Sequence, residues 1–91
     1  MEFEWDEAKN LANIHKHGFP FEVATYVLQE PHYLNRSDRW NEERWIAIGS
    51  FEQALVAIIY TIRQDRYRII SIRRARNDEK EKYNSLYSRA D

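Results

Sequence analysis

Two apolar runs separated by a short polar break constrain the fold of this chain more than any other feature. Residues 55–62 (LVAIIYTI) and 67–72 (YRIISI) are rich in Val, Ile, Tyr and Thr, which strands favour. Apolar side chains occur at both odd and even positions, so we expect both faces of these strands to be covered. The break between them is short enough for a tight turn. The sequence therefore predicts a central β-hairpin.

The length of the hairpin turn decides which arginines share a face of the sheet, because side chains alternate along a strand. A three-residue loop would place Arg63 on the face of Ser71 and Arg73. A two- or four-residue loop would place it with Arg68 and Arg74 instead. The sequence leaves both registers open.

Basic residues concentrate in this half of the chain. Residues 44–76 hold seven arginines and two carboxylates, whereas residues 1–43 hold four basic and nine acidic side chains. Guanidinium groups bind phosphate or carboxylate through a planar fork, so the arginines either recognise an anionic ligand or pair with the acidic N-terminal half. Because an unpaired buried charge is costly, four arginines should lie where the strands emerge toward solvent or a ligand. These are Arg63, Arg68, Arg73 and Arg74.

The N-terminal part is expected to form a short strand at residues 3–5 and then two helices. Asp6 fits an N-cap and Gly18 fits the left-handed C′ position, so the first helix should span residues 7–17. Its apolar stripe is assigned to Ala8, Leu11, Ala12 and His15, flanked by Ile14. Pro20 fits the start of a second helix, which should continue to about residue 29.

The remaining elements complete an α+β chain. We expect an edge strand at residues 32–35, a strand at 44–48 and a turn at Gly49-Ser50 before the hairpin. A last helix should start at residue 77 or 78 and dock through Tyr83, Leu86 and Tyr87. The predicted fold is a single domain, residues 1–91, with a small antiparallel meandering sheet, two N-terminal helices and a C-terminal helix.

Composition excludes several classes of protein. The chain has no cysteine, which rules out disulfides and thiolate metal sites. No apolar stretch approaches the roughly 20 residues that span a bilayer, and the acidic N-terminus lacks an apolar signal region. We expect a cytoplasmic protein with no membrane association.

The common catalytic signatures are absent, and His15 and His17 are spaced so that they point apart on a helix. We therefore expect no metal and no cofactor. A histidine at a helix end and arginines at strand ends suffice for RNA cleavage, in which the 2′-hydroxyl attacks the adjacent phosphate. Histidine can transfer protons near neutral pH, and arginine can stabilise the developing phosphate charge.

Each candidate also has a structural interpretation. His17 beside Gly18 can simply complement the C-terminus of its helix, and Lys16 can be a solvated charge. The three tryptophans, Trp5, Trp40 and Trp45, fit core or interface positions better than base stacking.

Several segments also resemble one protein family, the BrnT toxins. FEWDEAKNLANIHKHGFPFEVA at residues 3–24 is similar to the family opening F-x-W-D-x-x-K-x-x-x-N-x-x-K-H-G-x-x-F-x-x-A. EERWIAIG, YTIR and RIISIRRA are similar to its E-x-R-x-x-x-I-G, Y-T-x-R and R-I-I-S-A-R-x-A segments. Ile72 departs from this pattern, which usually has alanine there; a bulkier group would crowd a pocket that it faced.

The resemblance implies a RelE-like ribonuclease toxin of a type II toxin–antitoxin pair, which cleaves RNA and so inhibits translation. It implies a BrnA-type antitoxin as partner, contact with operator DNA only through the antitoxin complex, and allows a dimer in that complex. On the matching positions it suggests catalytic roles for His17, Arg63 and Arg73. Lys16, Arg44, Arg68 and Arg74 are expected to bind RNA. The alternative is a non-catalytic, antitoxin-binding subunit of a toxin–antitoxin repressor complex.

Overall fold

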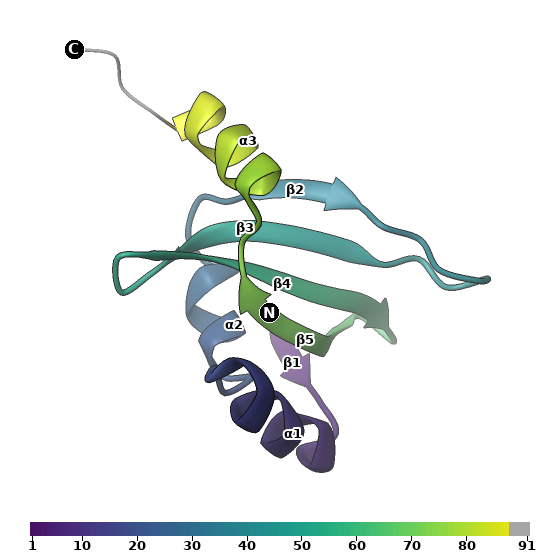
Figure 1. Cartoon of the computed structure of the whole chain (residues 1–91). Helices are drawn as coiled ribbons and strands as arrows, with labels where there is room; N and C mark the ends of the chain where they lie inside the picture. Colours follow the sequence, from purple (N-terminus) through teal and green to yellow (C-terminus); the bar gives the residue numbers. More distant parts are fainter. Residues whose placement is uncertain (88–91) are drawn as a thin grey trace.

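A computed structural model describes residues 1–87 of the 91-residue chain. These residues form one sheet with strand order β1-β5-β4-β3-β2 and three helices (Figure 1). In chain order the elements are β1 (Glu2–Glu4), α1 (Glu7–His17), α2 (Val23–Val27), β2 (Tyr33–Arg36), β3 (Trp45–Phe51), β4 (Ala54–Arg63), β5 (Arg66–Arg74) and α3 (Asn77–Tyr87). The α+β class predicted from the sequence is confirmed.

The sheet is mixed, so the prediction of a purely antiparallel sheet was wrong. Strand β1 runs parallel to β5, with Phe3 opposite Tyr67, whereas β2 to β5 form antiparallel pairs. Helices and three further strands separate β1 from β5 along the chain, so no hairpin forces these two strands to run in opposite directions. The relation to the RelE-like fold stays a prediction.

The hairpin of β4 and β5 closes through a two-residue turn and then changes register. Gln64 and Asp65 both have left-handed backbones (φ 50° and 65°), as tight hairpin turns require. Ile59 of β4 pairs with Ser71 and Tyr60 pairs with Ile69, so Ile70 is an extra residue on β5 and forms a β-bulge there. The predicted grouping of Arg63 with Ser71 and Arg73 is therefore observed, although the loop has two residues instead of three, and of the alternative grouping only Arg68 shares this face.

The bulge defines which residues reach each face of the sheet. Arg63 lies opposite Arg66, and Thr61 opposite Arg68, as a two-residue loop requires. Beyond the bulge, however, Ser71 and Arg73 share that face, and Arg74 turns to the other.

The two faces carry different cores. The face toward α1 and α2, called here the α1–α2 face, buries Phe21, Val27, Val56, Ile58 and Ile72. The opposite face, the α3 face, has a smaller cluster in which Tyr83 of α3 packs near Ile48, Ala57 and Ala75. Figure 1 shows α3 on one side of the sheet and the other two helices on the opposite side. Because α3 covers only part of its face, the rest stays open.

Helix α1 has the predicted ends but not the predicted inner face. Asp6 accepts hydrogen bonds from the Ala8 and Lys9 N–H groups, and Gly18 is left-handed at φ 82°. Leu11 and Ile14, however, are 61% and 39% exposed, so the predicted apolar stripe points outward.

The residue that α1 buries is Asn13. Its amide donates to the carbonyls of Phe19 and Ile72 at 2.8 and 3.0 Å, and its oxygen accepts from the Ile72 N–H at 3.1 Å. Asn10 likewise accepts from the Phe21 N–H at 2.7 Å. Hydrogen bonds rather than an apolar stripe therefore attach α1 to the edge of β5.

Two further predictions were wrong in detail. The second helix is limited to residues 23–27, because the preceding turns bond three residues apart, as between Val23 N–H and Pro20 O. Gly49 lies inside β3 instead of in a turn. A Cβ there would lie 2.6 Å from Val27 Cγ1, so glycine lets α2 approach the sheet. The turn falls at residues 52–53, both left-handed.

Helix α3 docks through two of its three predicted residues. Tyr83 joins the smaller core, and the Tyr87 hydroxyl donates to the His32 carbonyl at 2.8 Å. Leu86 is 59% exposed and does not dock. Within residues 1–87, no helix combines the length and the apolar character needed to cross a membrane.

We predict that Asn13→Ala destabilises the protein by about 2–4 kcal/mol, because two backbone groups of Ile72 lose their partner in a buried setting. Urea unfolding measures the change. Asn84→Ala, at an exposed position of α3, is the matched control and should change stability little. Equal stabilities of the two variants would contradict the anchoring role of Asn13.

Candidate functional site

The uncovered part of the α3 face holds a groove of about 480 Å³. Its floor is apolar and comes from three adjacent elements, with Ile46 on β3, Ile59 on β4 and Ile70 on β5. Among residues 1–87, five cations and no carboxylate line it. These residues, which define the cationic groove, are Lys16, Arg39, Arg44, Arg73 and Arg76.

Local structure explains how distant segments meet at this groove. The bulge at Ile70 turns Ser71 and Arg73 toward it. The Asn13 bonds hold the last turn of α1 at the open edge of β5, which brings Lys16 to the rim.

His17 lies in a second hollow of about 230 Å³, which shares Lys16, Ile70 and Ser71 with the cationic groove. The histidine is half-buried in the last turn of α1. His17 and the groove arginines therefore line adjoining hollows.

Arg73 is held by the C-terminal helix. Its Nη1 and Nη2 groups donate to the two carboxylate oxygens of Glu79 at 2.8 and 2.9 Å, and Nη1 also donates to the Arg74 carbonyl. This hydrogen bonding raises the pKa of Arg73 and lowers that of Glu79. In the part of the chain that the structure describes, the Nε–H and one Nη2–H of Arg73 remain free for a ligand.

Glu42 joins two further arginines. It accepts from Arg44 Nε at 2.8 Å and from Arg63 Nη2 at 3.1 Å, and these bonds lower its pKa. Arg44 lines the cationic groove, whereas Arg63 does not and is 57% exposed at the end of β4. The structure thus links Arg63 to the groove only through Glu42.

Two predicted RNA-binding residues lie elsewhere. Arg68 shares the groove's side of the sheet but donates to Glu4 at 2.9 Å beside β1. Arg74 turns to the α1–α2 face, with its guanidinium 5.9 Å from the Phe19 ring. Ile72 is fully buried on that same face, so its bulk does not narrow the groove.

Sequence reasoning missed Arg39 and Arg76. Neither forms an ion pair within residues 1–87, and both line the cationic groove. Arg76 closely follows Arg73 and Arg74 in the sequence, and this position could have identified it as a candidate. Arg39 stood in a polar loop of mixed charge, where nothing distinguished it.

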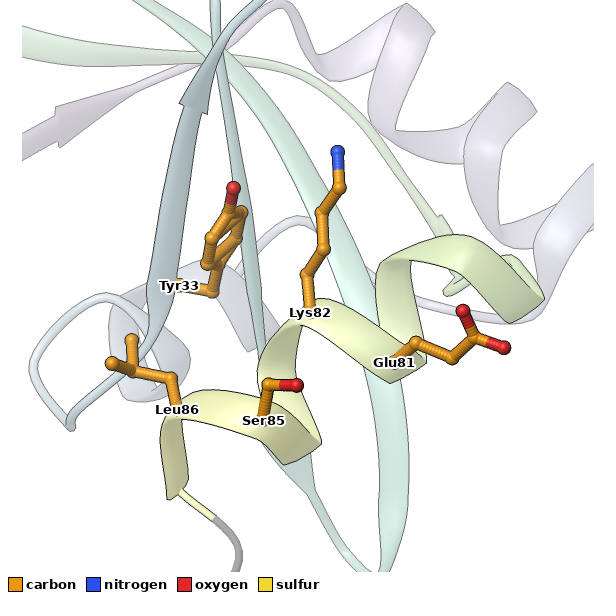
Figure 2. Close-up of a pocket in the computed structure, with 5 residues that line it drawn as sticks. All are labelled: Tyr33, Glu81, Lys82, Ser85 and Leu86. Atoms are coloured by element: carbon orange, nitrogen blue, oxygen red, sulfur yellow. The ribbon is translucent and has the colours of Figure 1, made fainter.

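A hollow beside α3, of about 460 Å³, is a weaker candidate. Tyr33, Ser85 and Leu86 line it together with Glu81 and Lys82. In Figure 2 Lys82 extends alongside Tyr33, whereas Glu81 points away from the tyrosine. Among residues 1–87 a single cation lines this hollow, so these residues offer a phosphate chain less positive charge than the cationic groove does.

We predict that Glu79→Gln lowers stability by about 1–3 kcal/mol at neutral pH, because Arg73 loses a largely buried, charged partner. The folded-state pKa of Glu79 lies below its ordinary value of 4.5, so the pair stabilises the fold above that pH. The difference from wild type should shrink as the pH falls through the lowered pKa.

Urea unfolding at neutral and acidic pH checks this prediction. Glu81→Gln, an exposed position on the same helix, is the control and should behave as wild type. A stability gap that is independent of pH would contradict the role assigned to the ion pair.

Residues 5–79 match the model of a family described as the ribonuclease toxin, BrnT, of type II toxin–antitoxin systems. No curated protein and no solved structure gives a significant match.

Proposed function

Since this chain belongs to the BrnT family of type II toxin–antitoxin ribonucleases, we propose that it is a metal-independent endoribonuclease that inhibits translation. The observation that carries the proposal is the cationic groove, in which five basic side chains meet over an apolar floor next to the hollow of His17. Phosphates bind such cations, and exposed bases can lie on apolar surface. An antitoxin protein encoded with the toxin would be its partner in the cytoplasm.

In the proposed reaction the 2′-hydroxyl loses its proton and bonds the adjacent phosphorus, while the bond from phosphorus to the 5′-oxygen of the next nucleotide breaks and that oxygen takes up a proton. His17 exchanges a proton with a reacting oxygen, since imidazole titrates near neutral pH. Arg73 and Lys16 neutralise the phosphate where the two hollows meet, and Arg44, Arg39 and Arg76 hold the flanking backbone. Arg63 acts through Glu42, which orients Arg44.

We predict that His17→Ala slows RNA cleavage by about 10²–10⁴-fold, because a positioned acid or base supplies an acceleration of that order. Cleavage of end-labelled RNA in EDTA measures the rate. His15→Ala is the matched control, since His15 is exposed on the same last turn and lines neither hollow. Equal loss in both variants would contradict the role of His17.

We further predict that Arg73→Lys slows cleavage about tenfold to a hundredfold, because lysine keeps the charge and a partner for Glu79 but lacks the fork. Arg74→Lys, one residue away on the opposite face, should cleave as wild type. The same assay measures both variants, with unfolding curves to show that each is folded. A fully active Arg73→Lys protein would exclude a bidentate phosphate contact.

The same assay separates the alternative function. Wild-type protein that leaves RNA intact in EDTA, yet binds its antitoxin tightly, would instead be a non-catalytic subunit of a repressor complex. The pairing of Arg44 and Arg73 with carboxylates is compatible with such a structural role. Lys16, Arg39 and Arg76 form no ion pair within residues 1–87, and this favours a groove that binds RNA.

A further inference from the structure

The most exposed large apolar side chain in residues 1–87 is Trp40, at 97%. It stands in the loop between β2 and β3, which extends past the end of the sheet in Figure 1. The prediction of a core position for this tryptophan was wrong, and an interface position stays a prediction. A single exposed apolar side chain is common on protein surfaces, so the groups around this indole decide what it could bind.

The loop holds Trp40 in a defined place. Arg39 and Glu42 exchange two backbone hydrogen bonds, of 3.1 and 2.9 Å, so that residues 40 and 41 form a tight turn. Trp40 has a left-handed backbone at φ 58°, which is strained for a bulky residue. Arg36 anchors the base of the loop through Asp38 and Glu43.

This tip adjoins the cationic groove. Arg39, the neighbour of Trp40, lines the groove, and Glu42 across the turn bonds the groove residue Arg44. Trp40 therefore lies in a turn whose two ends, Arg39 and Glu42, line the groove or bond a residue that lines it.

The surroundings of Trp40 suit a base more than a protein. Tryptophan hot spots of protein interfaces lie among other apolar groups that exclude water. Here the neighbours Asp38, Arg39 and Asn41 are all polar and exposed. A lone aromatic face beside phosphate-binding cations matches the pattern by which proteins bind single-stranded nucleic acid.

We propose that Trp40 stacks on an unpaired base of single-stranded RNA whose phosphates lie in the cationic groove. The inference rests on the proposed function and adds a recognition element to it. Only unpaired bases present a free face, because the bases of a duplex stack on one another. Every base can stack on an indole, so Trp40 increases the affinity for single-stranded RNA and does little to select among bases.

The test measures binding of short, fluorescently labelled single-stranded RNA whose 2′-hydroxyls are methylated. Methylation prevents attack by the 2′-oxygen, so binding is measured without cleavage. Trp40→Ala should weaken binding about tenfold, as loss of one stacked base does, and Trp40→Phe should restore most of the affinity. The dependence of affinity on salt should stay unchanged, because Trp40 contacts no phosphate. Arg39→Ala should reduce that dependence instead.

Tyr26→Ala is the matched control, since Tyr26 is another exposed aromatic residue, 63% accessible, on α2 across the sheet. It should bind RNA as wild type does. Unfolding curves of Trp40→Ala should match wild type, because the exposed indole packs against nothing that it would lose.

Three outcomes would overturn the inference. If the wild type binds RNA and Trp40→Ala binds it equally tightly, the inference about Trp40 is refuted and the proposed function stands. Unchanged RNA binding with weakened antitoxin binding would reassign Trp40 to a protein interface. Wild-type protein that neither binds nor cleaves RNA would refute both the inference and the proposed function.

Discussion

The extra residue in β5 is the constraint on which the rest of the structure depends. Without the bulge at Ile70, strict alternation would place Ile69 and Ile72 on opposite faces. With it, both enter the core beneath α1 and α2, opposite Tyr60 and Ile58 respectively. Burial of Tyr60 in that core raises the pKa of its hydroxyl to about 12, so it stays neutral. The same shift sends Arg73 to the open face, so one inserted residue completes the core and equips the groove.

The sequence predicted where helices and strands lie better than it predicted which of their faces are buried. Val, Ile and Tyr in residues 55–72 were sufficient to identify the hairpin, and Asp6 and Gly18 marked both ends of α1. Periodicity failed for α1, because a hydrogen-bonded Asn13 replaces the apolar contact that the method assumes. It also failed at Gly49, where close approach of a helix and not a turn requires the missing side chain.

The candidate site shows a similar limit. The sequence left open whether the arginines pair with the acidic N-terminal half, and only some of them do. Those that pair with Glu2, Glu4 or Glu42 are Arg44, Arg63, Arg66 and Arg68. The Arg73 pair instead comes from Glu79, in the last helix. Charge counting could locate a basic half of the chain. It could not tell which cations remain for a ligand, since that depends on partners that are distant in sequence.

Asn13 also affects how molecules of this protein meet one another. A strand at the edge of a sheet normally presents free N–H and C=O groups, onto which a strand of another chain can add. The Asn13 carboxamide occupies both such groups of Ile72, as a neighbouring peptide would. A side chain thus takes the place of a neighbouring strand at Ile72, and a strand of another molecule cannot pair with that residue while the Asn13 bonds hold.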